Sequence, residues 1–131
     1  MRSAEAAKKA GAHATIDYRS EDVVARVTEL AGGLVDRIIE VDLGSNMGID
    51  ASLIAKNGTI ASYSSTRVPE PVLPYYDLAS KGANIRLIQG FLLTQEMHDA
   101  AVSRIARLAG AGTLRHPAIH AFSLDRVADA H

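Results

Sequence analysis

Apolar and polar residues follow two different periods along the chain, and the changes of period divide it into helices and strands. In residues 20–31, apolar side chains recur at helical spacing until Gly32–Gly33 ends the pattern. Residues 35–42, by contrast, form a β-branched run typical of a strand. The same analysis predicts helices at 3–10, 20–31, 45–56, before Gly82 and from 94 onward, and strands at 13–18, 35–42, 59–64, 85–93 and shortly before a C-terminal helix.

Residues that favour helix ends and turns set most of these boundaries. Ser20, Ser45 and Thr94 are each placed to cap the N-terminus of a helix, and Gly11 is placed to end the first one. Asn57–Gly58 is a turn dipeptide, so we expect a turn there before the next strand. The helix that follows Thr94 carries an apolar stripe that we expect to be core: Met97, Ala101, Val102, Ile105 and Leu108.

Strands that alternate with helices predict an α/β fold in which a parallel sheet is covered on both faces. In such sheets, ligands bind beyond the C-terminal ends of the strands. The residues at four of these ends are therefore our candidate binding residues: Tyr18 and Arg19; Asp42, Leu43 and Gly44; Tyr63, Ser64 and Ser65; Gly90 and Phe91.

The composition is that of an ordinary soluble globular protein, with 47% apolar and 22% charged residues among 131 and a formal net charge of −1. There is no basic excess to suggest a nucleic acid partner, and no run approaches the ~18–20 apolar residues of a membrane span. The alanine-rich N-terminus has no apolar signal core, so we expect a cytoplasmic protein. The chain has no cysteine, which excludes disulfides and cysteine-ligated zinc.

Two local patterns bear on further chemistry. His116 and His120 have the i,i+4 spacing of a metal-binding pair on a helix, but Pro117 disfavours a helix and no acidic ligand is adjacent, so we expect no metal site. A fully buried parallel strand is almost continuously apolar. The strand at 35–42 breaks that pattern, and we expect it to be less covered, because it carries Asp36, Arg37, Glu40 and Asp42.

Four segments, taken in order, resemble the medium-chain dehydrogenase/reductase superfamily: "AKKAGAHATIDYRSED", "GGLVDRIIEVDLGSN", "KNGTIASYSS" and "GTLRHPAIHAFSLDRVADAH". The resemblance is strongest to the zinc-independent quinone oxidoreductase branch, the zeta-crystallin-like enzymes. It implies that residues 1–131 form a single partial NAD(P)-binding domain, without the family's catalytic domain. The implied fold is a partial Rossmann-type parallel sheet with flanking helices, in which the first two strands and the glycine-rich turn are missing.

The resemblance also implies a cofactor, a reaction and roles for the candidate residues. The cofactor is NADPH, with NADH as the alternative and no zinc, and the reaction is hydride transfer to a quinone or similar conjugated carbonyl, with reactivity supplied by cofactor and acceptor. In similar enzymes the position of Tyr18, with Arg19 next to it, contacts the adenosine 2′-phosphate. The other positions lie along the ribose and nicotinamide: Asp42, Leu43 and Gly44 with backbone groups, Tyr63, Ser64 and Ser65 beside the carboxamide, and Gly90 and Phe91 against the nicotinamide ribose.

A gap in the sheet follows from the same resemblance. The family's strand order is 3-2-1-4-5-6, and by the resemblance residues 13–18 correspond to strand 3 and residues 35–42 to strand 4. Because strands 1 and 2 are missing, residues 13–18 in their family position would leave a gap of about three strand spacings, with unpaired backbone, beside residues 35–42. Unpaired buried amides are too costly to persist. Residues 13–18 must therefore close onto residues 35–42, another chain must pair there, or an edge is exposed.

The predicted strand at residues 85–93 is long and apolar, which makes it a poor free edge in a monomer. Similar enzymes dimerise through this strand, so we expect a homodimer. Three functional interpretations stay open from the sequence: part of the cofactor domain of an NADPH-dependent quinone oxidoreductase, a non-catalytic dimerising remnant or binding module of the same fold, or an enzyme completed by a partner chain.

Overall fold

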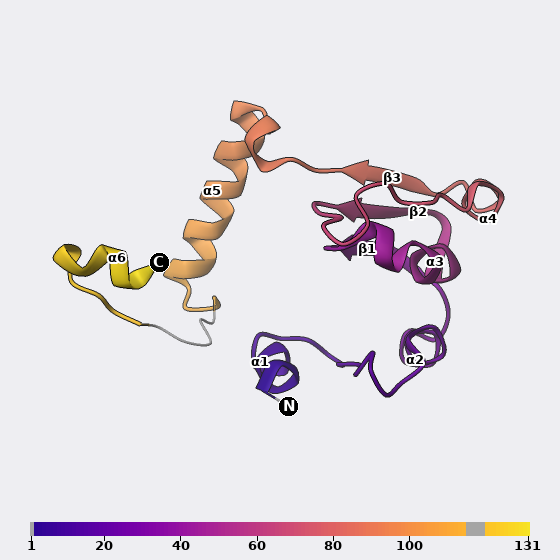
Figure 1. Cartoon of the computed structure of the whole chain (residues 1–131), viewed down its shortest axis with the longest axis horizontal. Coiled ribbons are helices and arrows are strands. Elements are labelled where there is room, and N and C mark those ends of the chain that lie inside the picture. The colour runs from indigo at the N-terminus through magenta and orange to yellow at the C-terminus, as the bar shows by residue number, and fades with distance from the viewer. Residues whose placement is uncertain (1, 115–119) are drawn as a thin grey trace. The chain divides into compact units, whose positions relative to one another are not determined.

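A computed structural model describes residues 2–114 and 120–131, which divide into two compact units (Figure 1). One unit, residues 16–95, contains the sheet. The other comprises the residues before 16 and after 95, and its elements are helical: α1 (Arg2–Lys9), most of α5 (Gln95–Gly110), the 3-10 helix η2 (Leu124–Arg126) and α6 (Val127–Ala130). Pro117 and His116, which the sequence analysis singled out, lie outside the described residues.

The sheet is parallel and has the order β1-β2-β3, with a helix before each strand. Helix α3 packs against β1 and β2 and contacts both α2 and α4. This arrangement confirms the expected α/β class. In chain order the elements are α2 (Val23–Ala31), β1 (Val35–Glu40), α3 (Leu43–Leu53), β2 (Ile54–Ser62), α4 (Tyr75–Ser80), β3 (Asn84–Leu87) and the 3-10 helix η1 (Gly90–Leu92).

The core of this unit lies between α3, the sheet and α4. Its fully buried side chains are Ile54 and Ile60, and the cluster is completed by Leu43, Met47, Ala51 and Leu78. The other face of the sheet is open, since Ile39 on β1 is 73% exposed. Within this unit, helices therefore do not cover the second face of the sheet, and the expected reduced covering of β1 is confirmed.

Two predicted N-caps are wrong by two or three residues. Asp22, rather than Ser20, caps α2, because its carboxylate accepts a hydrogen bond from the Ala25 amide at 3.0 Å, while the Ser20 amide bonds back to Asp17 in a turn. Helix α3 begins at Leu43, before Ser45, and ends at Leu53 rather than near 56. The next residue, Ile54, is extended and fully buried in β2.

The predicted turn at Asn57–Gly58 is a bulge inside β2. On β1 the paired positions advance from Val35 to Arg37, whereas their partners on β2 advance from Ile54 to Thr59. Asn57 takes the left-handed conformation, with φ of 59°. Asn57 thus adopts a backbone conformation that is typical of turns, but the chain continues in the same strand instead of reversing.

Two predicted strands do not form as expected. Residues 13–18 are in no strand, because a lone extended segment needs a neighbour for its hydrogen bonds, and β1 is left as a free edge of the sheet. Of the three outcomes considered for this gap, closure of residues 13–18 onto β1 is not found. The segment 85–93 is also shorter as a strand, with β3 ending at Leu87 and η1 following after two residues.

The apolar stripe of α5 is not buried. The helix has no fully buried residue, and Met97, Val102 and Ile105 are all exposed. The expectation that this stripe is core is therefore wrong for the described chain, although the helix itself lies where its period predicts.

Candidate functional site

The C-terminal ends of β1 and β2 meet and bring two of the predicted groups together. The Tyr63 amide donates to the Glu40 carbonyl at 3.1 Å, and the Leu43 amide donates to the Ser64 carbonyl at 3.1 Å. Parallel strands place these ends at one edge of the sheet. Residues 42–44 and 63–65 therefore form one corner, as the alternation of strands and helices predicted.

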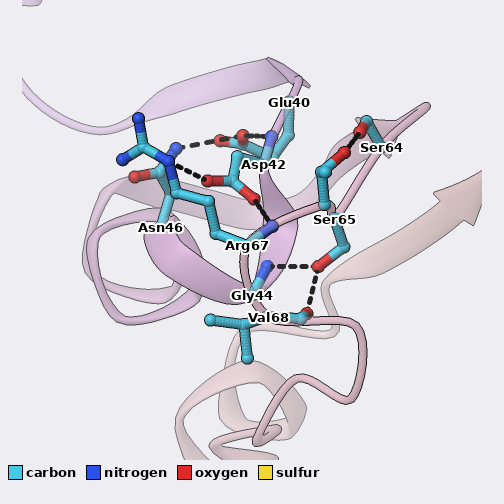
Figure 2. Close-up of polar contacts among 9 residues, drawn as sticks. Glu40, Asp42, Gly44, Asn46, Ser64, Ser65, Arg67 and Val68 are labelled. Carbon is cyan, nitrogen blue, oxygen red and sulfur yellow. Dashed lines mark hydrogen bonds and ion pairs between the residues drawn. The ribbon is translucent and has the colours of Figure 1, made fainter.

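Gly44 lets the loop after β2 approach the N-terminus of α3 (Figure 2). Its amide donates to the Ser65 hydroxyl at 2.9 Å, and that hydroxyl donates to the Val68 carbonyl at 2.6 Å. A Cβ at position 44 would lie 2.5 Å from the Val68 carbonyl oxygen and 2.6 Å from Val68 Cβ. Only glycine therefore fits at position 44 without a shift of the loop. The amides of Leu43 and Gly44, in the first turn of α3, are already hydrogen-bonded.

Asp42 joins the same corner to Arg67, which the sequence analysis did not identify. One carboxylate oxygen of Asp42 accepts from the Arg67 amide at 3.3 Å, and the other lies 3.6 Å from Arg67 Nε (Figure 2). Arg67 lies in the loop between β2 and α4, where no periodic pattern of apolar residues marks it. The Arg67 side chain is largely exposed, so this ion pair contributes at most about 1 kcal/mol.

The remaining candidate residues are exposed. Tyr18 is 68% exposed, and the Arg19 guanidinium lies 5.7 Å from the centre of its ring. Gly90 and Phe91 form the 3-10 helix after β3, and Phe91 is 84% exposed. The Ile88 amide donates to the Ser62 carbonyl at 2.8 Å, which holds the end of β3 beside the end of β2.

A cavity of about 680 Å³ opens beside this corner, between α2, β1 and α3. Tyr18 and Asp42 both line it, so two of the predicted groups border one space. Its other lining residues are Val23, Val27, Val35, Arg37, Ile38, Glu40, Val41, Asn46, Ile49, Asp50, Leu53 and Arg67.

Two buried carboxylates lie in the wall of this cavity, and the sequence analysis assigned neither to a site. Glu40 is 5% exposed and accepts hydrogen bonds from the Asp42 amide and, at 3.0 Å, from the Asn46 side-chain amide. Asp50 is 3% exposed, and no N–H or hydroxyl group of the described residues donates to its Oδ2. Burial, the neighbouring charge of Glu40 and a hydrogen bond from the protonated Asp50 carboxyl to Glu40 raise the pKa of Asp50 to about 7 from its ordinary 3.8.

A sequence signal for Asp50 exists in the spacing of α3. Leu43, Met47 and Ala51 recur at helical spacing and are buried. Asp50 falls on the same face, one position before Ala51 and three after Met47. An acidic residue on the buried face of a helix marks a carboxyl group in an unusual environment.

The corner can bind a ligand, and the cavity beside it contains a group that can take up a proton. Hydroxyl groups, backbone groups and exposed aromatic rings at the strand ends can orient a ligand, and Asp50 can exchange a proton near neutral pH. Among the described residues, His, Asp and Glu side chains nowhere form a group of three that could hold a metal ion. None of the described helices combines the length and apolarity needed to cross a membrane.

Comparison with known proteins identifies relatives that match most of this chain. The quinone oxidoreductase of Salmonella typhimurium strain LT2 is 29% identical over 117 residues, covering 86% of this chain and 36% of the relative. The quinone oxidoreductase of Pseudomonas syringae pv. tomato DC3000 is 25% identical, with a TM-score of 0.71, covering 97% of this chain and 40% of that structure. The Escherichia coli quinone oxidoreductase complexed with NADPH is 23% identical, with a TM-score of 0.69, covering 86% and 36%.

The chain thus spans little more than a third of the length of these relatives. Its three-stranded parallel sheet with flanking helices matches the Rossmann-like cofactor domain of the dehydrogenase structures. The family model described as zinc-binding dehydrogenase matches residues 10–131. The resemblance found in the sequence is therefore confirmed, and the chain belongs to the zinc-binding dehydrogenase family of the medium-chain dehydrogenase/reductase superfamily.

Proposed function

We propose that this chain forms part of the cofactor site of an NADPH-dependent oxidoreductase that reduces a quinone or a similar conjugated carbonyl. The observation that carries this proposal is the corner where residues 42–44 and 63–65 meet at the C-terminal edge of a parallel sheet, because ligands of such sheets bind there. The printed names of two relatives, both quinone oxidoreductases, support the choice of reaction.

Each candidate residue has a binding role in this proposal. Tyr18, with Arg19 over its ring, contacts the adenosine 2′-phosphate, which a guanidinium attracts. Gly44, Ser64 and their neighbours contact the ribose and nicotinamide, and the exposed ring of Phe91 supplies an apolar contact. The bound nicotinamide supplies the hydride, while the protein binds and orients it.

No step of this proposal passes through zinc, although the family name includes the metal. Structural or catalytic zinc is held by three or four His, Cys, Asp or Glu ligands. The described residues do not assemble such a set, and the whole chain has no cysteine. The residues described here therefore do not fit a zinc site.

A homodimer through residues 85–93 is the second part of this proposal. Strand β3 is an edge strand, and its neighbourhood exposes apolar side chains, with Leu87 72% and Leu92 74% exposed. Pairing with a second copy would cover this edge. Light scattering at micromolar concentration should report twice the chain mass. Leu87→Arg should produce a monomer, whereas Val72→Arg, at an exposed position in a loop, should leave the dimer intact.

The alternative function, a non-catalytic binding module, is favoured by one observation. The amides of Leu43 and Gly44, at the N-terminus of α3, are already bonded to Ser64 and Ser65. They are not available to an anionic ligand unless the loop after β2 moves. A module that binds only part of a nucleotide, or none, would be consistent with that arrangement.

Titration calorimetry with NADPH, and with NADH for comparison, tests the proposal. Micromolar binding with NADPH preferred is the expected result. Tyr18→Ala should reduce the preference for NADPH, whereas Tyr76→Ala, which removes another exposed tyrosine in α4, should leave it unchanged. Absence of binding up to millimolar NADPH would overturn the proposal for this chain and leave the binding module as its function.

A further inference from the structure

The loop that follows β2 lies across the N-terminus of α3 and takes up its hydrogen-bond donors (Figure 2). The Leu43 amide donates to the Ser64 carbonyl at 3.1 Å, and the Gly44 amide donates to the Ser65 hydroxyl at 2.9 Å. The first amides of a helix have no partner within it, so they bond to acceptors outside the helix. Two groups of this loop therefore occupy donors that lie where we propose that the cofactor binds.

This loop is held by polar contacts rather than by burial. Among the described residues, neither the buried core cluster nor the apolar residues packed against it include any of residues 64–68. Val68, the apolar member of the loop, is 37% exposed. Segments with few buried apolar contacts open locally at a small cost in free energy. The loop can therefore leave α3 while the sheet stays intact, including the hydrogen bond from the Tyr63 amide to the Glu40 carbonyl.

Asp42 fastens the far end of the loop to the start of α3. One of its carboxylate oxygens accepts from the Arg67 amide at 3.3 Å, and the other lies 3.6 Å from Arg67 Nε. Asp42 is the N-cap of α3, a position at which aspartate usually accepts from an amide of the first turn. Its side chain makes no such bond to α3, and the Ser65 hydroxyl takes the Gly44 amide instead. The Asp42 carboxylate therefore holds the loop rather than the helix.

We propose that residues 64–68 form a latch over the N-terminus of α3, which the ion pair of Asp42 and Arg67 keeps closed, and that NADPH binds when the latch opens. On opening, the Ser64 carbonyl and the Ser65 hydroxyl exchange the amides of α3 for donors of the cofactor. Arg67 is then a positioning residue that acts through the loop and weakens cofactor binding by favouring the closed latch. The ligand in this inference rests on the proposed function, whereas the latch itself does not.

Two variants loosen the latch while they change the net charge in opposite directions. Arg67→Gln removes a positive charge and Asp42→Asn removes a negative one, and each breaks the same ion pair. Because an ion pair this exposed contributes little, its loss should raise the population of the open latch by up to about fivefold. Arg104→Gln and Asp36→Asn make the same charge changes at exposed positions of α5 and β1, and they should leave the latch closed.

Native-state hydrogen exchange, followed by NMR without NADPH, measures the opening directly. The Ser65 hydroxyl protects the Gly44 amide only while the latch is closed, so this amide should exchange about two- to fivefold faster in both latch variants than in the wild type. The amide of Ile60, a residue fully buried in β2, reports on opening of the sheet and should exchange at an unchanged rate. Unchanged exchange of Gly44 in both latch variants would overturn the proposal.

Titration calorimetry with NADPH then tests what the latch controls. Both latch variants should bind NADPH about two- to fivefold more tightly than the wild type, although their charges change in opposite directions. The two charge controls should bind NADPH as the wild type does. Weaker binding by Arg67→Gln would overturn the proposal, because the guanidinium would then contact the cofactor directly. If none of these proteins bound NADPH but exchange of Gly44 still responded, the cofactor proposal would fail and the latch would be confirmed.

Discussion

Replacing Asp50 by asparagine should stabilise the fold, and the gain should grow with pH. The ionised carboxylate of Asp50 is buried beside Glu40, with one oxygen unbonded. Asparagine has nearly the same shape and carries no charge, so it removes the cost of ionisation. Its side-chain NH₂ can also donate to the Glu40 carboxylate, which is otherwise a like-charged neighbour.

The sign and size of the effect follow from the two pKa values of Asp50, 3.8 ordinarily and about 7 in the fold. A raised carboxyl pKa means that the folded state binds the proton more tightly between these values, so the free energy of unfolding falls as pH rises from about 4 to about 7. At about 1.4 kcal/mol per pKa unit, the destabilisation is about 2 kcal/mol at pH 5 and about 4 kcal/mol at pH 8.

Urea unfolding of both proteins at pH 5 and pH 8 measures this difference. The stability gained by Asp50→Asn should be about 2–3 kcal/mol larger at pH 8 than at pH 5. Asp36→Asn removes the same charge at an exposed position of β1, and its effect should be small and nearly independent of pH. If the stabilities of wild type and Asp50→Asn changed in parallel with pH, the carboxyl group would not be titrating as the structure requires.

Three further substitutions test local features of the fold by urea unfolding. Gly44→Ala should cost about 1–3 kcal/mol because its Cβ would meet Val68, whereas Gly48→Ala in the same helix, with no atom within 4 Å, should gain up to about 1 kcal/mol; equal effects would refute the contact. Lys81→Met should cost about 1–2 kcal/mol because the ammonium donates to two carbonyls at the end of α3, at 2.6 and 2.9 Å; an unchanged midpoint would refute that role. Asn57→Val should cost about 1–2 kcal/mol because φ is positive there, and Asn57→Gly should be nearly neutral; the opposite order would refute the bulge.

The helices could be predicted from the sequence because their signals are local. The spacing of apolar residues placed α2 and α5 to within a few residues, and the cap residue Ser45 placed α3 equally closely. Gly32 ends α2 in the left-handed conformation, as its place in the sequence indicated. The exact caps could not be predicted, because several residues near a helix start can accept its amides. Asp22 takes that role once Ser20 is engaged in the preceding turn.

The strands were predicted less well because a strand exists only with a neighbour. Residues 13–18 have the composition of a strand, yet no pairing partner lies beside them. Residues 85–93 are mostly apolar, but only the part that pairs with β2 is a strand, and η1 follows from Gly90. Composition shows that a segment suits a sheet, whereas pairing depends on what the rest of the fold provides.

The candidate site, like the fold, could be predicted only in part. Its corner at residues 42–44 and 63–65 was predictable, because parallel connectivity places strand ends together whatever the side chains are. The pairing of Glu40 with Asp50 was not, because the two residues belong to different elements and their burial is set by packing. The charged residues that interrupt β1 gave a partial signal, and the helical spacing that places Asp50 on the buried face of α3 gave another.

One pair of variants can separate ligand binding at the corner from proton uptake by Asp50. Tyr63 lies at the corner, is exposed and does not line the cavity, whereas Asp50 lines the cavity and is buried. Tyr63→Ala should therefore weaken NADPH binding and leave the pH dependence of stability unchanged. Asp50→Asn should do the reverse: it should remove the fall in stability between pH 5 and pH 8 and, because it removes a negative charge, should leave NADPH binding unchanged or make it slightly tighter. If Asp50→Asn weakened NADPH binding as much as Tyr63→Ala does, the buried carboxyl would be part of the cofactor site.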